Sequence, residues 1–215
     1  MQKHTFKAEK TVRYFSLGEL NKQTKHVWIV LHGYGQLPQF FLKKFEPLVD
    51  AQCVVLAPEG LSRFYLEGFK GRVGASWMTS DDREQEIEDY INYLTAFFTT
   101  KVQPYVNADC QIHVIGFSQG AATACRWVNS GLVKVNELVL WAGSFPHDLN
   151  FDLAKQIFNQ LKLTLVVGNK DEFEPLIKLQ DHQNKLNELG IKFNVVEFEG
   201  GHDIDKKTLE KYFKV

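Results

Sequence analysis

The pentapeptide GFSQG at residues 116–120 constrains the fold of this chain more than any other feature. It follows the apolar run Ile112–Ile115 and precedes a helix-like stretch that begins at Ala121. A G-x-S-x-G sequence in this setting is typical of a strand that turns sharply into a helix and holds its serine on a strained backbone. The glycine and serine content of the chain gives about 0.03 such pentapeptides by chance. We therefore interpret Ser118 as a nucleophile; the plainer alternative is a capping serine in a tight glycine-rich turn.

Short apolar runs alternate with amphipathic segments along all 215 residues. This alternation predicts an α/β fold, in which helices cover both faces of a mostly parallel sheet, as one domain over residues 1–215. Two early segments, Thr5–Glu9 and Val12–Leu17, are predicted to form an antiparallel hairpin at the sheet edge. Six further runs are predicted to be buried parallel strands: Val27–Leu31, Cys53–Ala57, Ile112–Ile115, Glu137–Trp141, Leu163–Val167 and Phe193–Phe198.

Four helices are predicted from apolar spacing and from residues that begin or end helices. The clearest is Ile87–Phe98, for which Ser80–Asp82 would supply the cap and Pro104 the stop. A second helix is predicted to begin just after Ser118 and to end at Gly131. The remaining two are predicted over Pro175–Leu189 and Lys206–Phe213. The stretch Glu59–Trp77 has no clean periodicity and is predicted to be a long loop, which in a compact domain is usually functional.

A nucleophilic serine needs a base, and the base needs an acid that orients it. His202 lies in a Gly-Gly-His-Asp loop directly after the last predicted strand, and Asp171 follows the run Leu163–Val167. The chain order Ser118, Asp171, His202, with each residue at the carboxyl end of a strand, is the order of a Ser-His-Asp triad on a parallel sheet. The alternatives are a plain loop histidine and an Asx-turn aspartate. Glu172 is a weaker candidate for the acid.

The other six of the seven histidines have structural explanations. His113 lies inside a predicted strand and is expected to be a core residue with a backbone hydrogen bond. His32 is expected to support a glycine-rich loop. The remaining four are expected to be solvated surface residues: His4, His26, His147 and His182.

Acyl transfer also needs N–H donors aimed at the oxygen that becomes negative. The residue after the nucleophile supplies one, here the backbone of Gln119. A second is expected from the His-Gly-Tyr-Gly loop that follows Val27–Leu31, and within it we select the N–H of Tyr34.

Composition excludes several other classes of protein. The formal charge of −1 leaves no basic footprint for nucleic acid. No apolar run is long enough to span a bilayer, and the first residues lack the apolar segment of a secretory signal, so a cytoplasmic protein is expected. Three scattered cysteines, Cys53, Cys110 and Cys125, are expected to be small buried residues. No histidines and carboxylates have metal-ligand spacing, so no metal or cofactor is expected. The oligomeric state stays open, a homodimer included.

These motifs together resemble the phospholipase/carboxylesterase family of the α/β-hydrolase fold, which includes acyl-protein thioesterases and small carboxylesterases. Glutamine after the serine in GFSQG is the most specific match. The resemblance implies Ser118 as nucleophile, His202 as base and Asp171 as orienter, with Tyr34 and Gln119 as backbone donors. The matching pieces, in family order, are Leu31–Gly35, Ala57-Pro58, Ser76-Trp77, residues 116–120, Gly168–Asp171 and Gly200–His202.

The resemblance weakens around the substrate pocket. Gln36 stands where the family commonly has aspartate, and Trp77-Met78-Thr79 replaces a Trp-aromatic-Asp sequence. We expect an acyl or aryl pocket, with Arg63 and Arg72 free to meet a negative substrate group. Its predicted lining is Phe64, Tyr65, Trp77 and Met78. The alternative is that these aromatic residues pin a long loop to the body.

The sequence therefore predicts a serine hydrolase that cleaves small carboxylic esters, or thioesters, through an acyl-enzyme. Lysophospholipase or acyl-protein thioesterase activity is the nearest alternative. A non-catalytic binding protein on the same fold and a peptide hydrolase are weaker ones, because the triad is complete and the length leaves no room for an added gating domain.

Overall fold

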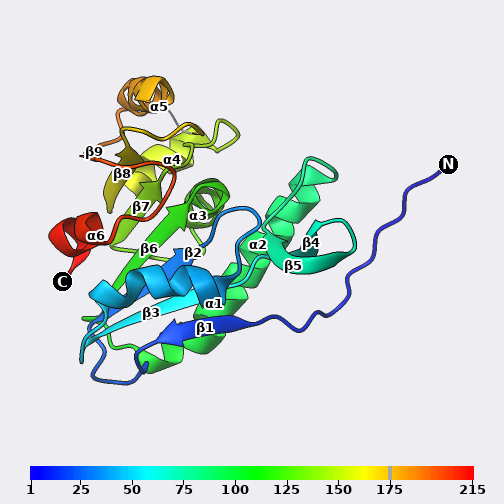
Figure 1. Cartoon of the computed structure of the whole chain (residues 1–215), viewed down its shortest axis with the longest axis horizontal. Helices are drawn as coiled ribbons and strands as arrows, with labels where there is room; N and C mark the ends of the chain where they lie inside the picture. Colours follow the sequence, from blue (N-terminus) through cyan, green and yellow to red (C-terminus); the bar gives the residue numbers. More distant parts are fainter. Residues whose placement is uncertain (174–175) are drawn as a thin grey trace.

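Seven strands form a single twisted sheet that passes through the centre of the molecule (Figure 1). The structure is a computed structural model and describes residues 1–173 and 176–215. Every neighbouring pair of strands is parallel except β1 and β3, which are antiparallel. In spatial order the strands are β1 (Tyr14–Leu17), β3 (Cys53–Pro58), β2 (His26–Leu31), β6 (Gln111–Phe117), β7 (Glu137–Trp141), β8 (Lys162–Gly168) and β9 (Asn194–Phe198). The six predicted parallel strands are confirmed.

The predicted edge hairpin is only half correct. Val12–Leu17 contributes β1, which supplies the expected antiparallel edge, but Thr5–Glu9 forms no strand. This segment is part of an exposed N-terminal tail without regular structure (Figure 1), in which Lys7 pairs with Glu88. Phe6 is its one large apolar side chain and is 91% exposed, so strand pairing would bury little apolar surface.

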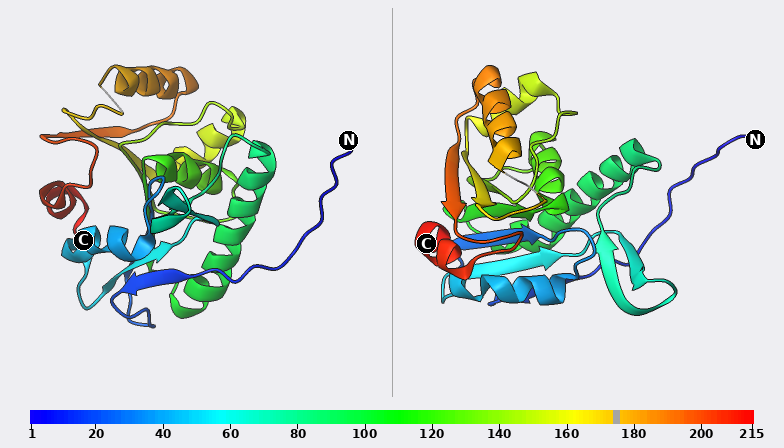
Figure 2. Two further views of the ribbon diagram at one scale, coloured as in Figure 1. Left: turned by 45° about the vertical axis from the view of Figure 1, so that its right-hand side comes forward. Right: turned by 45° about the horizontal axis from the view of Figure 1, so that its top comes forward.

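The predicted long loop at Glu59–Trp77 is wrong, because most of it forms a β-hairpin. Strands β4 (Ser62–Glu67) and β5 (Lys70–Ser76) pair antiparallel as a separate two-stranded sheet. Gly68 adopts a φ of 59° at the turn. The hairpin projects from the main body (Figure 2). Most of its side chains are exposed on both faces, so it lacks the alternation of apolar and polar residues by which a half-buried strand is recognised.

The four predicted helices are present as α2 (Arg83–Phe97), α3 (Gln119–Asn129), α5 (Leu176–Leu189) and α6 (Lys206–Phe213). The predicted start of α5 at Pro175 lies outside the described residues. The predicted cap of α2 is wrong: Asp82 has a φ of 49° and makes no side-chain cap hydrogen bond. After α2, a π-helical segment (Phe98–Val102) and a 3-10 helix (Gln103–Tyr105) extend the helical path through Pro104, so it ends at Tyr105 and not at the predicted stop. Two helices were not predicted because they are short: α1 (Pro38–Phe41), which a 3-10 helix (Leu42–Leu48) continues, and α4 (Phe151–Phe158).

Helices cover both faces of the sheet, as predicted (Figures 1 and 2). One apolar cluster lies under α1, the following 3-10 helix and α6, and includes Phe45 and Phe213. The other lies under α2 to α5 and includes Leu94, Trp127 and Phe158. All three cysteines are free and buried. In the described ranges no helix combines the length and the apolar character that crossing a bilayer requires.

Candidate active site

Ser118 occupies a strained turn between β6 and α3. Its backbone has φ 53° and ψ −117°, a left-handed φ that costs a non-glycine residue energy. Gly116 and Gly120 make the turn possible: a Cβ on Gly116 would lie 2.2 Å from the carbonyl oxygen of Gly120, and one on Gly120 would lie 2.2 Å from that of Leu31. The Ser118 N–H donates to the Trp141 carbonyl at 2.9 Å. The sharp strand-to-helix turn predicted from GFSQG is therefore present.

Ser118, His202 and Asp171 lie in one hydrogen-bonded line. Nε2 of His202 is 3.0 Å from Oγ of Ser118, and Nδ1 of His202 is 2.8 Å from Oδ2 of Asp171. An ionised carboxylate only accepts, so Nδ1 carries the proton and Nε2 is left to accept from the serine hydroxyl. The Asp171 side chain is fully buried, whereas that of His202 is 21% exposed. The arrangement can take a proton from the serine at a position that a small molecule reaches.

Backbone hydrogen bonds between two loops bring Asp171 behind His202. The loop after β8 and the loop after β9 run side by side, because Asn169 N–H donates to the Phe198 carbonyl at 2.9 Å and Lys170 N–H to the Gly200 carbonyl at 2.8 Å. Oδ1 of Asp171 also accepts from Phe173 N–H at 2.9 Å. Adjacent parallel strands end at the same edge of the sheet, so residues 31 positions apart become neighbours.

Two aromatic rings flank the imidazole of His202. Phe117 lies 4.9 Å from it and Phe173 lies 5.0 Å from it, measured between ring centroids. Phe173 is 71% exposed, so it borders the open side of the histidine. Phe173 was not predicted from the sequence. The signal that could have found it is an aromatic residue two positions after Asp171, in an otherwise polar loop.

The loop after β2 comes close to Ser118 and carries the predicted oxyanion donor, the N–H of Tyr34. A Cβ on Gly33 would lie 3.2 Å from Cβ of Ser118, so the loop touches the nucleophile position. The neighbouring N–H groups are occupied: that of Gly33 by Oε1 of Gln36, that of Gly35 by the Ala75 carbonyl and that of Gln36 by the Gly33 carbonyl. Over residues 1–173 and 176–215, the N–H groups of Tyr34 and of Gln119 have no protein acceptor. Both are therefore available to an oxyanion.

His32 supports this loop from below, as expected. It is completely buried; its Nδ1 donates to the Gly33 carbonyl at 2.8 Å, and its Nε2 accepts from Gly60 N–H at 3.0 Å. Burial lowers the pKa of His32 to about 4, more than the hydrogen bond to Gly33 raises it. The ring is thus neutral near pH 7, which the acceptor role of Nε2 requires.

The Gln119 side chain fastens the segment Ser76–Met78 to the serine turn. Its Nε2 donates to the Met78 carbonyl at 2.8 Å, and its Oε1 accepts from Trp77 N–H at 3.1 Å. The Trp77 indole N–H donates in turn to the His32 carbonyl at 2.8 Å. Trp77 is only 1% exposed, so its expected place in the pocket lining is wrong: it braces the loop of Tyr34 from inside the core.

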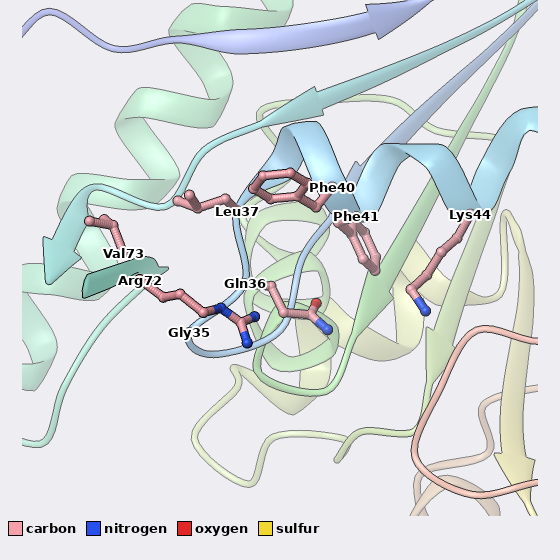
Figure 3. Close-up of a pocket in the computed structure, with 8 residues that line it drawn as sticks. All are labelled: Gly35, Gln36, Leu37, Phe40, Phe41, Lys44, Arg72 and Val73. Atoms are coloured by element: carbon pink, nitrogen blue, oxygen red, sulfur yellow. The ribbon is translucent and has the colours of Figure 1, made fainter. Parts of the chain in front are cut away.

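An open pocket of about 560 Å³ lies beside the Tyr34 loop (Figure 3). Gly35 and Gln36 of that loop form part of its wall. Its described lining includes none of the four residues predicted for the substrate pocket. Of these, Phe64 is half-buried and packs on Tyr34 at 5.1 Å between ring centroids, Tyr65 is 49% exposed and Met78 is partly buried.

A second histidine–carboxylate pair lies at the opposite end of the parallel strands, near where β6 and β7 begin. Nδ1 of His113 is 3.0 Å from Oε2 of Glu137, and its Nε2 is 3.2 Å from Nδ1 of His26. His113 is a core residue, as predicted, but these bonds are made with side chains and not with the backbone. His26, expected at the solvated surface, is half-buried beside it.

Comparison with known proteins agrees with this architecture. The sequence model of the phospholipase/carboxylesterase family matches residues 14–214. The structure of a carboxylesterase from Mesorhizobium loti superimposes with a TM-score of 0.72 at 17% identity, over 94% of this chain and 93% of that one. Acyl-protein thioesterase 2 from Zea mays gives a TM-score of 0.70 at 18% identity, over 93% and 95%. At these identities the likeness establishes a common fold. A search of curated protein sequences finds no match.

Proposed function

This chain belongs to the phospholipase/carboxylesterase family, and on that premise we propose that it is a serine esterase that cleaves carboxylic esters of small molecules with Ser118, His202 and Asp171. The observation that supports this most is the continuous line of hydrogen bonds from Ser118 Oγ through His202 to the buried Asp171 carboxylate. The line ends at a hydroxyl on a strained turn, and in this proposal the N–H groups of Tyr34 and Gln119 donate to the oxyanion.

In the first half of the reaction, Oγ of Ser118 attacks the ester carbonyl carbon while Nε2 of His202 takes the hydroxyl proton. Asp171 holds the imidazole in the required tautomer and stabilises the imidazolium that forms. The carbonyl oxygen becomes negative and accepts hydrogen bonds from the N–H groups of Tyr34 and Gln119. His202 then gives its proton to the alcohol oxygen, the bond between that oxygen and the acyl carbon breaks, and the alcohol leaves.

In the second half, a water molecule replaces the alcohol. His202 takes one of its protons, the resulting hydroxide attacks the acyl carbon, and the proton passes to Oγ of Ser118 as the carboxylic acid departs. The Tyr34 loop keeps one oxyanion donor in place for the two steps, and the serine turn at the start of α3 keeps the other, Gln119 N–H. His32, Gln119 and Trp77 act as positioning residues in this scheme, because each holds the loop or the turn by a hydrogen bond.

A thioester is the second substrate class that we consider, because the fold is shared with the acyl-protein thioesterase of Zea mays. The same nucleophile and oxyanion donors serve an ester and a thioester, which differ in the atom that leaves. Rates on an oxygen ester and a thioester with the same acyl group decide between the two.

The test combines labelling with kinetics. The purified protein is treated with a fluorophosphonate, the adduct is mapped by mass spectrometry, and nitrophenyl esters from acetyl to palmitoyl are assayed with Ser118→Ala as control. We expect one adduct, at Ser118, and a loss of about 10⁴–10⁶ in kcat for the alanine variant. Full turnover by Ser118→Ala would overturn the proposal.

A further inference from the structure

The pocket beside the Tyr34 loop combines an apolar wall with two cations, and we propose that it selects esters that carry an anionic group, such as a carboxylate, close to the scissile bond. This inference rests on the proposed esterase function and names its substrate class. The six side chains that carry it are Leu37, Phe40, Phe41, Val73, Lys44 and Arg72.

The pocket is next to the reacting groups and not at a remote surface. Gln36, which forms part of its wall, holds Gly33 through the N–H···Oε1 hydrogen bond of 2.9 Å, and a Cβ on Gly33 would lie 3.2 Å from Cβ of Ser118. On the other side, Lys44 is paired with Asp203, the residue that follows His202. The pocket wall is thus linked by hydrogen bonds to the loop before the serine turn on one side and to the His202 loop on the other.

The shape and the polarity of the pocket fit a small amphiphilic molecule. Its volume of about 560 Å³ is in the range of small-molecule sites. Phe41 packs on Phe117 with ring centroids 5.9 Å apart, so the apolar wall continues to the residue before Ser118. The hydrocarbon part of a substrate would pack on this wall, and the charged part would meet the two cations.

Both charged residues in the described lining are cations, and they differ in how they are paired. Arg72 on β5 and Lys44 on the 3-10 helix extend into the hollow from opposite sides (Figure 3). Lys44 is partly neutralised by Asp203. No carboxylate of the described residues lies within ion-pair distance of Arg72. Its planar guanidinium can bind a carboxylate through two parallel N–H bonds.

Arg63, on the other strand of the same hairpin, is an arginine that is already paired with a carboxylate. Its Nε lies 3.3 Å from Oε1 of the buried Glu59, which also binds Arg13 at 2.8 Å. Of the two arginines expected to meet a negative substrate group, only Arg72 is thus in the pocket and uncommitted. Arg63 is therefore a matched control with the same charge on the same hairpin.

The experiment compares two pairs of esters, each with a charged member and a neutral one. Nitrophenyl hemiadipate and its methyl ester place the charge on the acyl side; acetoxybenzoate and its methyl ester place it on the alcohol side. The readout is the ratio of kcat/KM for charged over neutral ester, after subtraction of the rate with Ser118→Ala. Wild type, Arg72→Gln, Arg72→Lys and Arg63→Gln are measured at low and high salt.

We expect the ratio for at least one pair to fall about tenfold in Arg72→Gln, mainly through KM, because a charge-assisted hydrogen bond is lost. Arg72→Lys should recover part of the ratio, and Arg63→Gln should keep the wild-type ratio. High salt should lower the ratio in wild type, Arg72→Lys and Arg63→Gln, but not in Arg72→Gln. The pair of esters whose ratio changes shows whether the acyl part or the alcohol part of the substrate enters the pocket. Equal ratios for wild type and Arg72→Gln with both pairs overturn the inference while the esterase function stands. If no ester is hydrolysed above the Ser118→Ala rate, the proposed function itself fails.

Discussion

Two histidine–carboxylate pairs lie at opposite ends of the parallel strands, which we call the carboxyl edge and the amino edge of the sheet. The hydrogen bonds between histidine and carboxylate have nearly the same length in the two pairs. At the carboxyl edge His202 binds Asp171 at 2.8 Å, and at the amino edge His113 binds Glu137 at 3.0 Å. In both, the carboxylate fixes the proton on Nδ1 and leaves Nε2 to face a third group. The pairs differ in that third group. Nε2 of His202 faces a serine hydroxyl, whereas Nε2 of His113 faces the ring of His26 at 3.2 Å.

The surroundings of the two pairs explain why only one is suited to catalysis. His113 is packed against Trp28, with ring centroids 4.3 Å apart, and its side chain is only 7% exposed. The partner of His202 is a serine on a left-handed backbone, and the imidazole is open on one side. A histidine–carboxylate pair is thus a common way to satisfy buried polar groups. It becomes an active site where a nucleophile and an entry for substrate complete it.

The largest expected effect separates the two histidines. Asparagine retains an N–H close to the position of Nδ1 but removes Nε2, so His202→Asn and His113→Asn delete the same function at each edge. We expect His202→Asn to lower kcat/KM for a nitrophenyl ester about 10⁴–10⁶-fold and His113→Asn to stay within about twofold of wild type. Steady-state kinetics on both variants measure this. Comparable losses in the two would remove the distinction that we draw.

Substitution of the two carboxylates should also affect kcat differently, with a smaller loss than for the histidines. In Asp171→Asn the amide can bind Nδ1 in the wrong tautomer, and kcat should fall about 10⁴-fold. Glu137→Gln makes the same chemical change at the amino edge and should leave kcat near the wild-type value at a temperature where the variant is folded. Near wild-type activity of Asp171→Asn would show that this carboxylate does not orient the base.

His32 sharpens the comparison, because both hydrogen bonds given for its buried ring are to backbone groups, and Glu59 acts on it only through its charge. The pKa of His32 is about 4 in the folded protein, below the ordinary value of about 6.5. As the pH falls from about 6.5 to about 4, the unfolded chain therefore binds a proton that the folded protein does not, and the free energy of unfolding decreases. At pH 4 this amounts to about 3 kcal/mol relative to neutral pH.

Urea unfolding at several pH values, in wild type and His32→Asn, measures this contribution. Asparagine does not titrate. Between pH 7 and pH 4 the free energy of unfolding of His32→Asn should therefore decrease by about 3 kcal/mol less than that of wild type. Parallel pH profiles for the two proteins would contradict a neutral, buried His32.

The smallest expected effect concerns the stability that Glu137 supplies. Burial raises the pKa of Glu137, but hydrogen bonds from His113 and Lys162 and the charge of Lys162 outweigh burial, so the pKa is lower than usual. Its contribution is therefore present above the ordinary glutamate pKa and is lost as the pH falls through the lowered value. We expect Glu137→Gln to lower the free energy of unfolding by about 1–3 kcal/mol at pH 7. The difference in free energy of unfolding between Glu137→Gln and wild type should shrink in acid. A difference that grows in acid would contradict a lowered pKa of Glu137.

Features carried by local sequence were predictable here, and those set by long-range contacts were not. The turn at Ser118 was predictable from GFSQG because its two glycines stand where a Cβ would collide with backbone, Gly116 with Gly120 and Gly120 with the end of β2. Asp171 and His202 were predictable from their places after buried strands. The hairpin β4–β5 escaped prediction because its exposed strands carry no periodicity. Trp77 was assigned to the pocket from its aromatic character, but its burial depends on Gln119 and His32, which are distant in sequence. Arg63 pairs with Glu59 four residues earlier, but Glu59 also pairs with Arg13, 46 positions away, which the sequence did not indicate.

The most direct test of the central claim, that only the pair at the carboxyl edge activates a nucleophile, is the rate of fluorophosphonate labelling with the adduct mapped to its residue. The account predicts that wild type and His113→Asn label Ser118 at the same rate and that His202→Asn labels at least about 10³-fold more slowly. Labelling of another residue, or undiminished labelling of Ser118 in His202→Asn, would contradict it.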